Sequence, residues 1–167
     1  LSGPSFAVEV AAGKPTAVTL AMPQLQQAID IAGQLSGPDF RIYASDDVTG
    51  VEVGGALKNI IAIAVGICRG MNLGSSAEAA LLARGNAEIL RFASAFGAQP
   101  RTLQGLAGLG DLFLTCSSLT SRNFSYGVML GRGEGHLPHK LAEGVQTVGI
   151  AAEIARERNI DAPIIEV

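Results

Sequence analysis

Residues 53–65 of this 167-residue chain read VGGALKNIIAIAV, an apolar stretch with the spacing of a buried helix. We predict a helix over residues 49–69 that ends at Gly70 and around which the rest of the chain is organised. Between Glu52 and Arg69 its only charged residue is Lys58. This lysine within an apolar run is the first candidate for a functional side chain.

Lys58 has no carboxylate within helical reach, since its neighbours there are Gly54, Gly55, Ile61 and Ala62. Burial disfavours the charged form of a lysine, and this is the usual route to a lysine that donates or accepts protons near neutral pH. Alternatively, Lys58 lies at the edge of the helix and extends its ammonium group to water. The residues alone leave both interpretations open.

The glycine pair Gly54-Gly55 indicates close packing against the turn before Lys58. Glycine inside a helix costs about 1 kcal/mol relative to alanine, so two in a row need a compensating contact. Small residues on this face would leave room for a ligand beside Lys58. A tight helix crossing would explain the same glycines.

Asp111 follows a glycine-rich loop, GLAGLG at residues 105–110, which can bring a carboxylate and backbone amides to a site. Thr115 lies one helical turn later, so both side chains can face the same cavity. The alternative is that Asp111 only caps the helix that follows.

Residues 121–123, SRN, form the best candidate for an anion site. Ser121 is a typical N-cap, and the start of a helix offers free amides and a favourable dipole to an anion. Arg122 adds a bidentate donor, although a basic residue is otherwise unfavourable at that end of a helix. The alternative is that Arg122 pairs with a surface carboxylate.

Two parts are expected along the chain, with a boundary near residues 45–48. The first part opens with a loop and a helix in residues 1–12, and then strands at 16–21 and 40–44 flank a helix at 23–35. This β-α-β unit is typical of a larger parallel sheet. The second part is helical, and its predicted helices cover residues 49–69, 75–97 with a Ser75-Ser76 cap, 101–105, a segment from Ser121, 145–158, and a segment from Asp161.

Composition excludes several classes of protein. Apolar residues make up 48% and charged residues 16%, which indicates a folded globular protein. A net charge of −3 without charged blocks gives no footprint for nucleic acid or an anionic membrane surface. The longest apolar run, residues 60–68, is far shorter than the roughly 18 residues of a membrane span. We therefore expect no nucleic acid and no membrane span.

Cysteine and histidine spacing argues against metal binding. Cys68 and Cys116 lie in apolar segments and are expected to be reduced core thiols of a cytoplasmic protein. His136 and His139 lack a third ligand. The chain starts without methionine and stops where a helix is expected to begin, so we expect a fragment of a longer protein.

Six short motifs occur in a characteristic order: GPSFA (3–7), GGALKN (54–59), GLGDL (108–112), LTC (114–116), SRN (121–123) and EG (143–144). Together they resemble the NAD(P)-dependent glycerol-3-phosphate dehydrogenase family, of bacterial type, over nearly the whole chain. GxGxxG and Walker loops are absent from the 167 residues, and so is a Ser/His/Asp signature.

The resemblance implies a mainly α fold. Residues 48–167 would form a helical substrate and catalytic domain like the C-terminal domain of 6-phosphogluconate dehydrogenase, preceded by the terminal β-α-β part of a Rossmann domain at residues 1–47. The family interconverts sn-glycerol 3-phosphate and dihydroxyacetone phosphate with NAD or NADP, for phospholipid synthesis. The main cofactor site and an upstream substrate lysine lie outside these residues, so the fragment is expected to be inactive alone. A homodimer is also considered.

The resemblance also implies roles for individual residues. Lys58 would be the general acid/base on the C2 oxygen. The implied substrate-binding residues are Ser5, where the family also accepts threonine, Lys58, Asn59, Asp111, Thr115, Ser121, Arg122 and Asn123. The implied cofactor contacts are Ala7, Arg122, Leu141 and Glu143.

Two alternatives stay open at this point. One is the helical domain of a related 2-hydroxyacid or 6-phosphogluconate-type dehydrogenase, which would also use a lysine but would bind a carboxylate. The other is a non-catalytic helical dimerisation module in which Lys58 merely reaches water.

Overall fold

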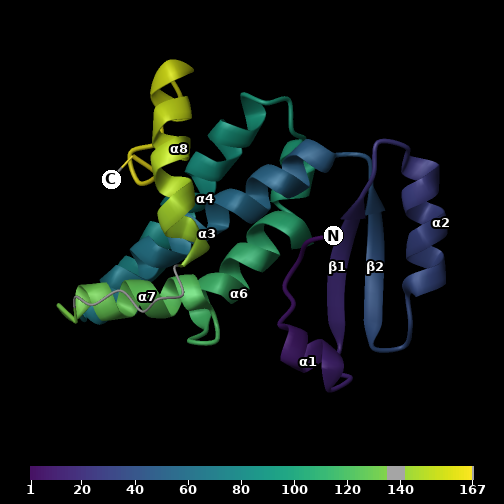
Figure 1. Cartoon of the computed structure of the whole chain (residues 1–167), viewed down its shortest axis with the longest axis horizontal. Helices are drawn as coiled ribbons and strands as arrows, with labels where there is room; N and C mark the ends of the chain where they lie inside the picture. Colours follow the sequence, from purple (N-terminus) through teal and green to yellow (C-terminus); the bar gives the residue numbers. More distant parts are fainter. Residues whose placement is uncertain (135–141, 167) are drawn as a thin grey trace.

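The computed structural model describes residues 1–134 and 142–166, and it is mainly helical, as predicted. Its elements in chain order are α1 (Ala7–Ala11), β1 (Thr16–Ala21), α2 (Leu25–Leu35), β2 (Phe40–Ser45), α3 (Val48–Gly70), α4 (Ser75–Ser94), α5 (Pro100–Leu103), the π-helical turn η1 (Leu106–Gly110), α6 (Asp111–Ser117), α7 (Arg122–Gly131) and α8 (Glu143–Glu157). Figure 1 shows α1, β1, β2 and α2 on one side and the remaining helices on the other.

The first part is a small parallel sheet covered by one helix. β1 and β2 pair in register from Thr16 opposite Phe40, and α2 connects them. Val18 and Ile42 form its core together with Ala32 of α2. The predicted β-α-β unit is therefore confirmed. The sequence did not indicate that Ser2 lies along the other edge of β1.

Helix α3 begins at the junction between the two parts, where Asp47 is its N-cap. One carboxylate oxygen of Asp47 accepts from Gly50 N at 2.9 Å, and the other accepts from Gln99 N at 2.8 Å. Burial raises the pKa of the Asp47 carboxyl, but the hydrogen bonds from Thr102 and from these two amides outweigh it, so the pKa is lowered. Asp47 therefore ties the start of α3 to the segment before α5.

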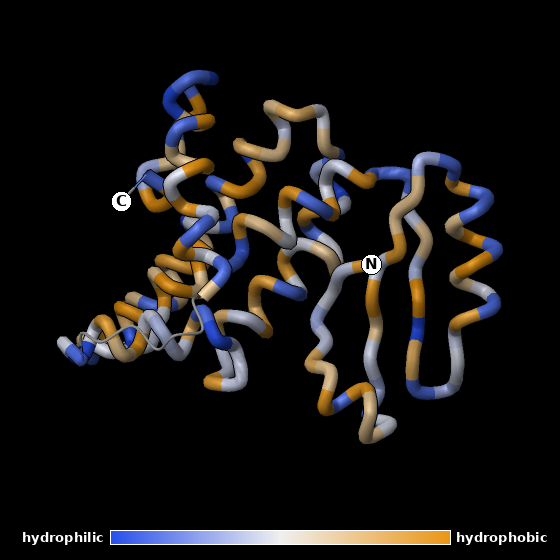
Figure 2. The backbone as a smooth tube through the Cα atoms, in the orientation of Figure 1, coloured by the Kyte–Doolittle hydropathy of each residue, from blue (hydrophilic) through white to orange (hydrophobic). Residues whose placement is uncertain are grey.

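Helix α3 is the central element of the second part. Its buried face includes Leu57, Ile61 and Val65, which pack with side chains of α4, α6, α7 and α8. Among the described residues, α3 alone has the length and mean hydropathy of a membrane span, and 56% of that window is buried against the protein. Figure 2 shows hydrophilic residues at the far end of α8 and along α2, away from this core.

Helices α3 and α7 cross so closely that only glycine fits at the contact. A Cβ atom on Gly127 would overlap the carbonyl oxygen of Ile63, and one on Gly66 would overlap the carbonyl oxygen of Phe124. Gly70 and Gly131 repeat this arrangement one turn further on. Each helix thus presents two glycines four residues apart, a spacing that allows backbones to approach directly.

Replacing Gly127 with alanine should therefore destabilise the full-length protein by about 2–3 kcal/mol, because the two helix backbones must move apart. Gly149→Ala is the matched control, since Gly149 is also helical but has open space around its Cα. That control should be neutral or slightly stabilising. Denaturant unfolding measures both variants, and equal stabilities would show that the crossing tolerates a methyl group.

Several boundaries differ from prediction. Helix α4 begins at Ser75, but Gly74 occupies the N-cap position with φ +91°, so the predicted Ser75-Ser76 cap is wrong. The glycines at 108–110 belong to η1 and not to an open loop. Within the described residues, the helix predicted from Asp161 is only a turn near Pro163.

A buried carboxyl group fixes that last turn. Glu88 of α4 is fully buried, and its oxygens accept hydrogen bonds from Ile164 N at 2.9 Å and from Ile165 N at 3.1 Å. These amides satisfy a polar group that would be costly to bury alone.

Candidate active site

Lys58 meets a carboxylate from a distant part of the chain. Its Nζ donates to Oδ2 of Asp111 at 2.5 Å, and the exposed fractions of the two side chains are 21% and 7%. Lys58 thus lies in a partly buried ion pair, and its ammonium group is not freely extended into water. A charged pair at this depth keeps its electrostatic effect because water screens it only partly.

Gly54 explains how Asp111 reaches Lys58. A Cβ atom on Gly54 would lie 3.0 Å from the carbonyl oxygen of Ala107, so η1 packs directly on α3 one turn before Lys58. The chain then enters α6 with Asp111 as its first residue. The helix-crossing alternative for Gly54 is therefore correct, and the packed turn takes the room expected for a ligand at that position.

Asp111 does not act as the N-cap that the loop pattern favoured. Gly110 occupies the N-cap position of α6, and the Asp111 carboxylate instead accepts from Ser2 Oγ at 3.0 Å as well as from Lys58. Thr115 Oγ1 donates to the carbonyl oxygen of Asp111 at 2.6 Å and lies 3.4 Å from its Oδ1. Three side chains from three segments thus surround one carboxylate.

The N-termini of α7 and α8 adjoin the same turn of α3. Ser121 caps α7, with its Oγ accepting from Phe124 N at 3.3 Å, as predicted. Asn123 Oδ1 accepts from Gly144 N at 2.9 Å, so this side chain joins α7 to α8. Gly144 lies against Asn59, because a Cβ atom there would be 2.8 Å from the Asn59 carbonyl oxygen.

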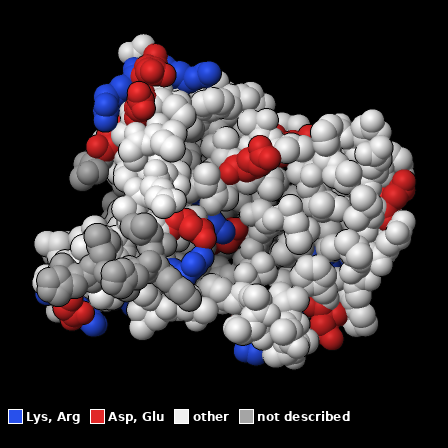
Figure 3. All heavy atoms as spheres, viewed as in Figure 1, with Lys and Arg blue, Asp and Glu red and all other residues white. Residues whose placement is uncertain are grey.

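Arg122 and Glu143 form an ion pair at the surface, with a distance of 2.6 Å and exposed fractions of 62% and 61%. The surface-carboxylate alternative for Arg122 is thus present in the structure. This ion pair also joins two residues that were both predicted to approach the cofactor. Figure 3 shows basic and acidic side chains gathered in a hollow in the middle of one face, where the helical part meets the sheet part.

Burial singles out the predicted residues. Eight polar or charged residues are buried among those described, and five of them are site candidates: Asn59, Asp111, Thr115, Ser121 and Asn123. Buried polar groups need partners, so these residues mark two polar places in an otherwise apolar domain, one at Asp111 beside Lys58 and one where α7 and α8 begin.

The remaining candidates are not brought into this cluster. Ser5 lies on the segment that leads into α1 and Ala7 is the first residue of that helix; both are exposed. Ser5 Oγ donates to the carbonyl oxygen of Gly3 at 3.2 Å. Leu141, predicted as a cofactor contact, lies outside the described residues, as do His136 and His139. Ser2 was not among the predicted site residues, although it stands directly before the GPSFA motif.

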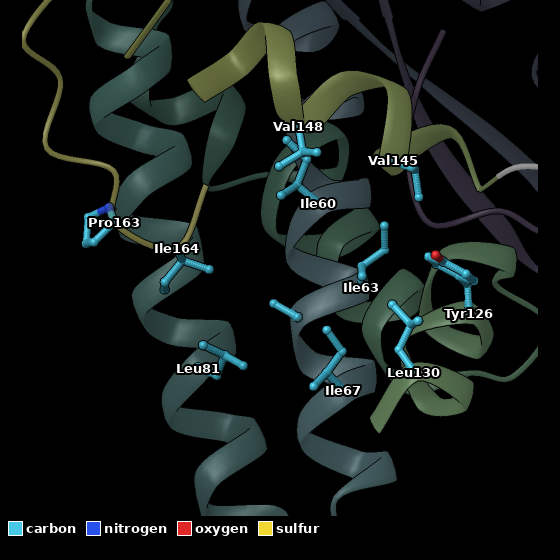
Figure 4. Close-up of a pocket in the computed structure, with 12 residues that line it drawn as sticks. Ile60, Ile63, Ile67, Leu81, Tyr126, Leu130, Val145, Val148, Pro163 and Ile164 are labelled. Atoms are coloured by element: carbon cyan, nitrogen blue, oxygen red, sulfur yellow. The ribbon is translucent and has the colours of Figure 1, made fainter. Parts of the chain in front are cut away.

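A separate apolar cavity of about 520 Å³ lies between α3, α4, α7 and α8. Figure 4 shows Ile63, Ile67 and Leu130 pointing into it from α3 and α7, opposite Val145 and Val148 of α8. No charged side chain lines it among the residues that the structure describes. It therefore offers mainly apolar packing surface, and Tyr126 brings the one side-chain hydroxyl among the described residues that line it.

No group of three metal-ligating side chains occurs within residues 1–134 and 142–166. Cys68 and Cys116 are both buried and free. Burial raises the pKa of the Cys116 thiol to about 12, and it also raises that of Cys68. Thiols of this kind are unreactive packing groups.

Comparison with known proteins gives consistent matches. The model of the family described as the C-terminus of NAD-dependent glycerol-3-phosphate dehydrogenase matches residues 47–167. The chain is 58% identical to glycerol-3-phosphate dehydrogenase [NAD(P)+] of Mesorhizobium japonicum over 99% of its own length and 48% of the relative's. The corresponding protein of Brucella ovis is 57% identical, with coverage of 99% and 51%.

Solved structures agree. The crystal structure of glycerol-3-phosphate dehydrogenase from Coxiella burnetii superposes with a TM-score of 0.90 at 45% identity, over 98% of this chain and 52% of that one. The yeast enzyme gives 0.89 at 26% identity, with coverage of 99% and 52%. The chain spans about half the length of the curated relatives it matches, and the 6-phosphogluconate-type alternative is not favoured. Since the family model covers well over half of its residues, the chain belongs to the NAD-dependent glycerol-3-phosphate dehydrogenase family, whose C-terminal part it matches from residue 47 onward.

Proposed function

We propose that this chain supplies the substrate site and the proton-transfer group of an enzyme that interconverts sn-glycerol 3-phosphate and dihydroxyacetone phosphate. The partly buried pair of Lys58 and Asp111 carries the proposal. It is a charged, polar centre next to two helix N-termini, in a chain that belongs to this family.

Lys58 is suited to the reacting oxygen. When hydride reaches C2 of the ketone, negative charge develops on the C2 oxygen, and a nearby ammonium group stabilises this charge and delivers a proton. Asp111 holds the Lys58 Nζ at 2.5 Å and thereby fixes its direction. In the reverse direction the same lysine accepts the hydroxyl proton. Asn59, next in sequence and buried, is proposed to hold the substrate beside it.

The start of α7 is suited to the phosphate. Ser121 Oγ already accepts from Phe124 N, so the amides of Arg122 and Asn123 are the ones proposed for an anion at the start of this ten-residue helix, and Arg122 stands in its first position. An exposed ion pair contributes about 0–1 kcal/mol, so Arg122 can leave Glu143 for a dianion at little cost. Ser121 and the amide nitrogen of Asn123 are the further proposed donors, and binding the phosphate orients C2.

The charged rim formed by Arg122 and Glu143 fits a position beside a cofactor, because both side chains are exposed and lie at helix N-termini. A nicotinamide cofactor, NAD or NADP, supplies the hydride when bound. Ala7 and Leu141 are proposed to complete this border, and Ser5 to line the substrate pocket. The main nucleotide site is proposed to lie outside these 167 residues.

The test is a comparison of substrates with the full-length enzyme. Dihydroxyacetone phosphate and a 2-ketoacid are each reduced with NADH and with NADPH. We expect kcat/KM to favour the phosphorylated ketone by at least about 10³-fold, since a site built for a dianion rejects a molecule without one. A preference for the ketoacid would overturn the assignment.

Further proposals concern the whole protein. We propose a Rossmann part at residues 1–47, a helical domain at 48–167, and a role in phospholipid precursor synthesis. Two free buried thiols support a reducing, cytoplasmic compartment.

Exposed Phe113 and Leu109 near α6 support a homodimer.

A further inference from the structure

Ser2 touches both the sheet and the ion pair of the candidate site. Its main chain pairs with Thr19 of β1 through two hydrogen bonds, of 2.9 Å from Ser2 N and 2.7 Å to Ser2 O. Its Oγ donates to Oδ2 of Asp111 at 3.0 Å. One residue thus connects the sheet part to the carboxylate that holds Lys58.

The neighbours of Ser2 fix its position. Gly3 has φ +152°, and a Cβ atom there would lie 2.8 Å from the Cα of Val18, so the segment can lie this close to β1 only with glycine. Pro4 packs beside Gly110, the residue that precedes Asp111, since a Cβ on Gly110 would be 3.5 Å from the Pro4 ring. Ser2 is therefore held between the backbone contact of Gly3 with β1 and the contact of the Pro4 ring with Gly110.

The Ser2 hydroxyl and the Lys58 ammonium group donate hydrogen bonds to the same oxygen of Asp111. Oδ2 of Asp111 receives both Lys58 Nζ and Ser2 Oγ, whereas Thr115 approaches Oδ1. Of the two donors, Ser2 is the one whose main chain is held independently, by its pairing with Thr19, so its hydroxyl restrains the rotation of the carboxylate. This rotation in turn sets the direction of the Lys58 ammonium group. Without the hydroxyl, Asp111 can turn about its side-chain bond and carry Lys58 with it.

We infer that Ser2 is a positioning residue: its hydroxyl holds the Asp111 carboxylate, and through it Lys58, in a fixed position relative to β1. The inference rests on the proposed function of Lys58. A purely structural tie between the two parts would stabilise the fold equally well, but would not affect Lys58 in particular.

The test uses Ser2→Ala and Ser2→Thr in the full-length enzyme. Ser2→Ala removes one hydrogen bond to a charged group, so we expect kcat for dihydroxyacetone phosphate to fall about 10-fold. KM should stay within about 2-fold, because the hydrogen bonds of Ser2 go to Thr19 and Asp111 and none goes to the proposed phosphate site at α7. Ser2→Thr keeps the hydroxyl and should restore most of kcat. Ser94→Ala, which removes an exposed hydroxyl of α4, should match the wild type.

A second measurement does not depend on turnover. Labelling of Lys58 by an amine-specific reagent is followed by mass spectrometry, with exposed Lys14 as the internal reference. Ser2→Ala should label several-fold faster at Lys58 than the wild type, and Ser2→Thr should not. If the wild type fails to reduce the phosphorylated ketone but labelling responds as expected, the proposed function fails and the positioning role stands. If Ser2→Ala leaves both kcat and labelling unchanged, the positioning role is overturned.

Discussion

Replacing Lys58 with alanine in the full-length enzyme should lower kcat for dihydroxyacetone phosphate by about 10⁴-fold, with a much smaller change in KM. The loss combines a missing proton donor and a missing positive charge at the developing alkoxide, each of which contributes strongly in a water-poor site. Steady-state rates with NADH or NADPH measure it.

Two controls separate chemistry from folding. Lys58→Arg keeps the charge next to Asp111 but donates a proton poorly, so it should remain at least about 10²-fold impaired. Unfolding of Lys58→Ala should show a loss of about 1–3 kcal/mol, because Asp111 loses its closest partner. A Lys58→Ala enzyme with near-normal kcat would restore the dimerisation-module alternative.

Replacing Arg122 with alanine should raise KM for the phosphorylated substrate about 10²-fold and lower kcat less. A charge-assisted, bidentate contact to a dianion is lost, whereas the pair of Lys58 and Asp111 is unchanged. Titration of KM against substrate with saturating cofactor measures the effect.

Glu143→Gln tests the proposed phosphate site by changing the partner of Arg122. It removes the carboxylate that pairs with Arg122 and should leave KM for the phosphorylated substrate unchanged or lower, since the guanidinium is then free. If Arg122→Ala binds dihydroxyacetone phosphate normally, the phosphate lies elsewhere.

Local patterns predicted the elements of this fold well. Runs of β-branched and apolar residues marked β1 and β2, and apolar helical patterns marked α3, α4 and α8, because those signals come from each segment's own burial. The start of α4 was wrong because Gly74 adopts a conformation that replaces a side-chain cap. The four glycines between α3 and α7 are visible in the sequence as two pairs with a spacing of four residues, Gly66 with Gly70 and Gly127 with Gly131, but the pairing of the two helices is not.

The candidate site was less accessible to local reasoning. The pattern around Lys58 showed that it has no partner on its own helix, but its partner Asp111 lies 53 residues away. Only the resemblance to the family predicted that Lys58 and Asp111 belong to one site. Ser2 is 109 residues from Asp111, and a serine before a glycine and a proline reads as a turn from sequence alone. Such contacts depend on packing between parts, which no short window contains.

Glu88 has a consequence for how the chain assembles. Its carboxyl group is enclosed only when Ile164 and Ile165 provide their amides, which lie 76 and 77 residues later in sequence. During synthesis, α4 therefore leaves the ribosome well before Ile164 and Ile165, whose amides bind the Glu88 carboxyl group, have been added to the chain. Contacts of this sequence separation slow folding, since a long loop must close before they form. Helix formation can proceed early, but the part of the helical core around Glu88 closes only after residues 164 and 165 have been synthesised.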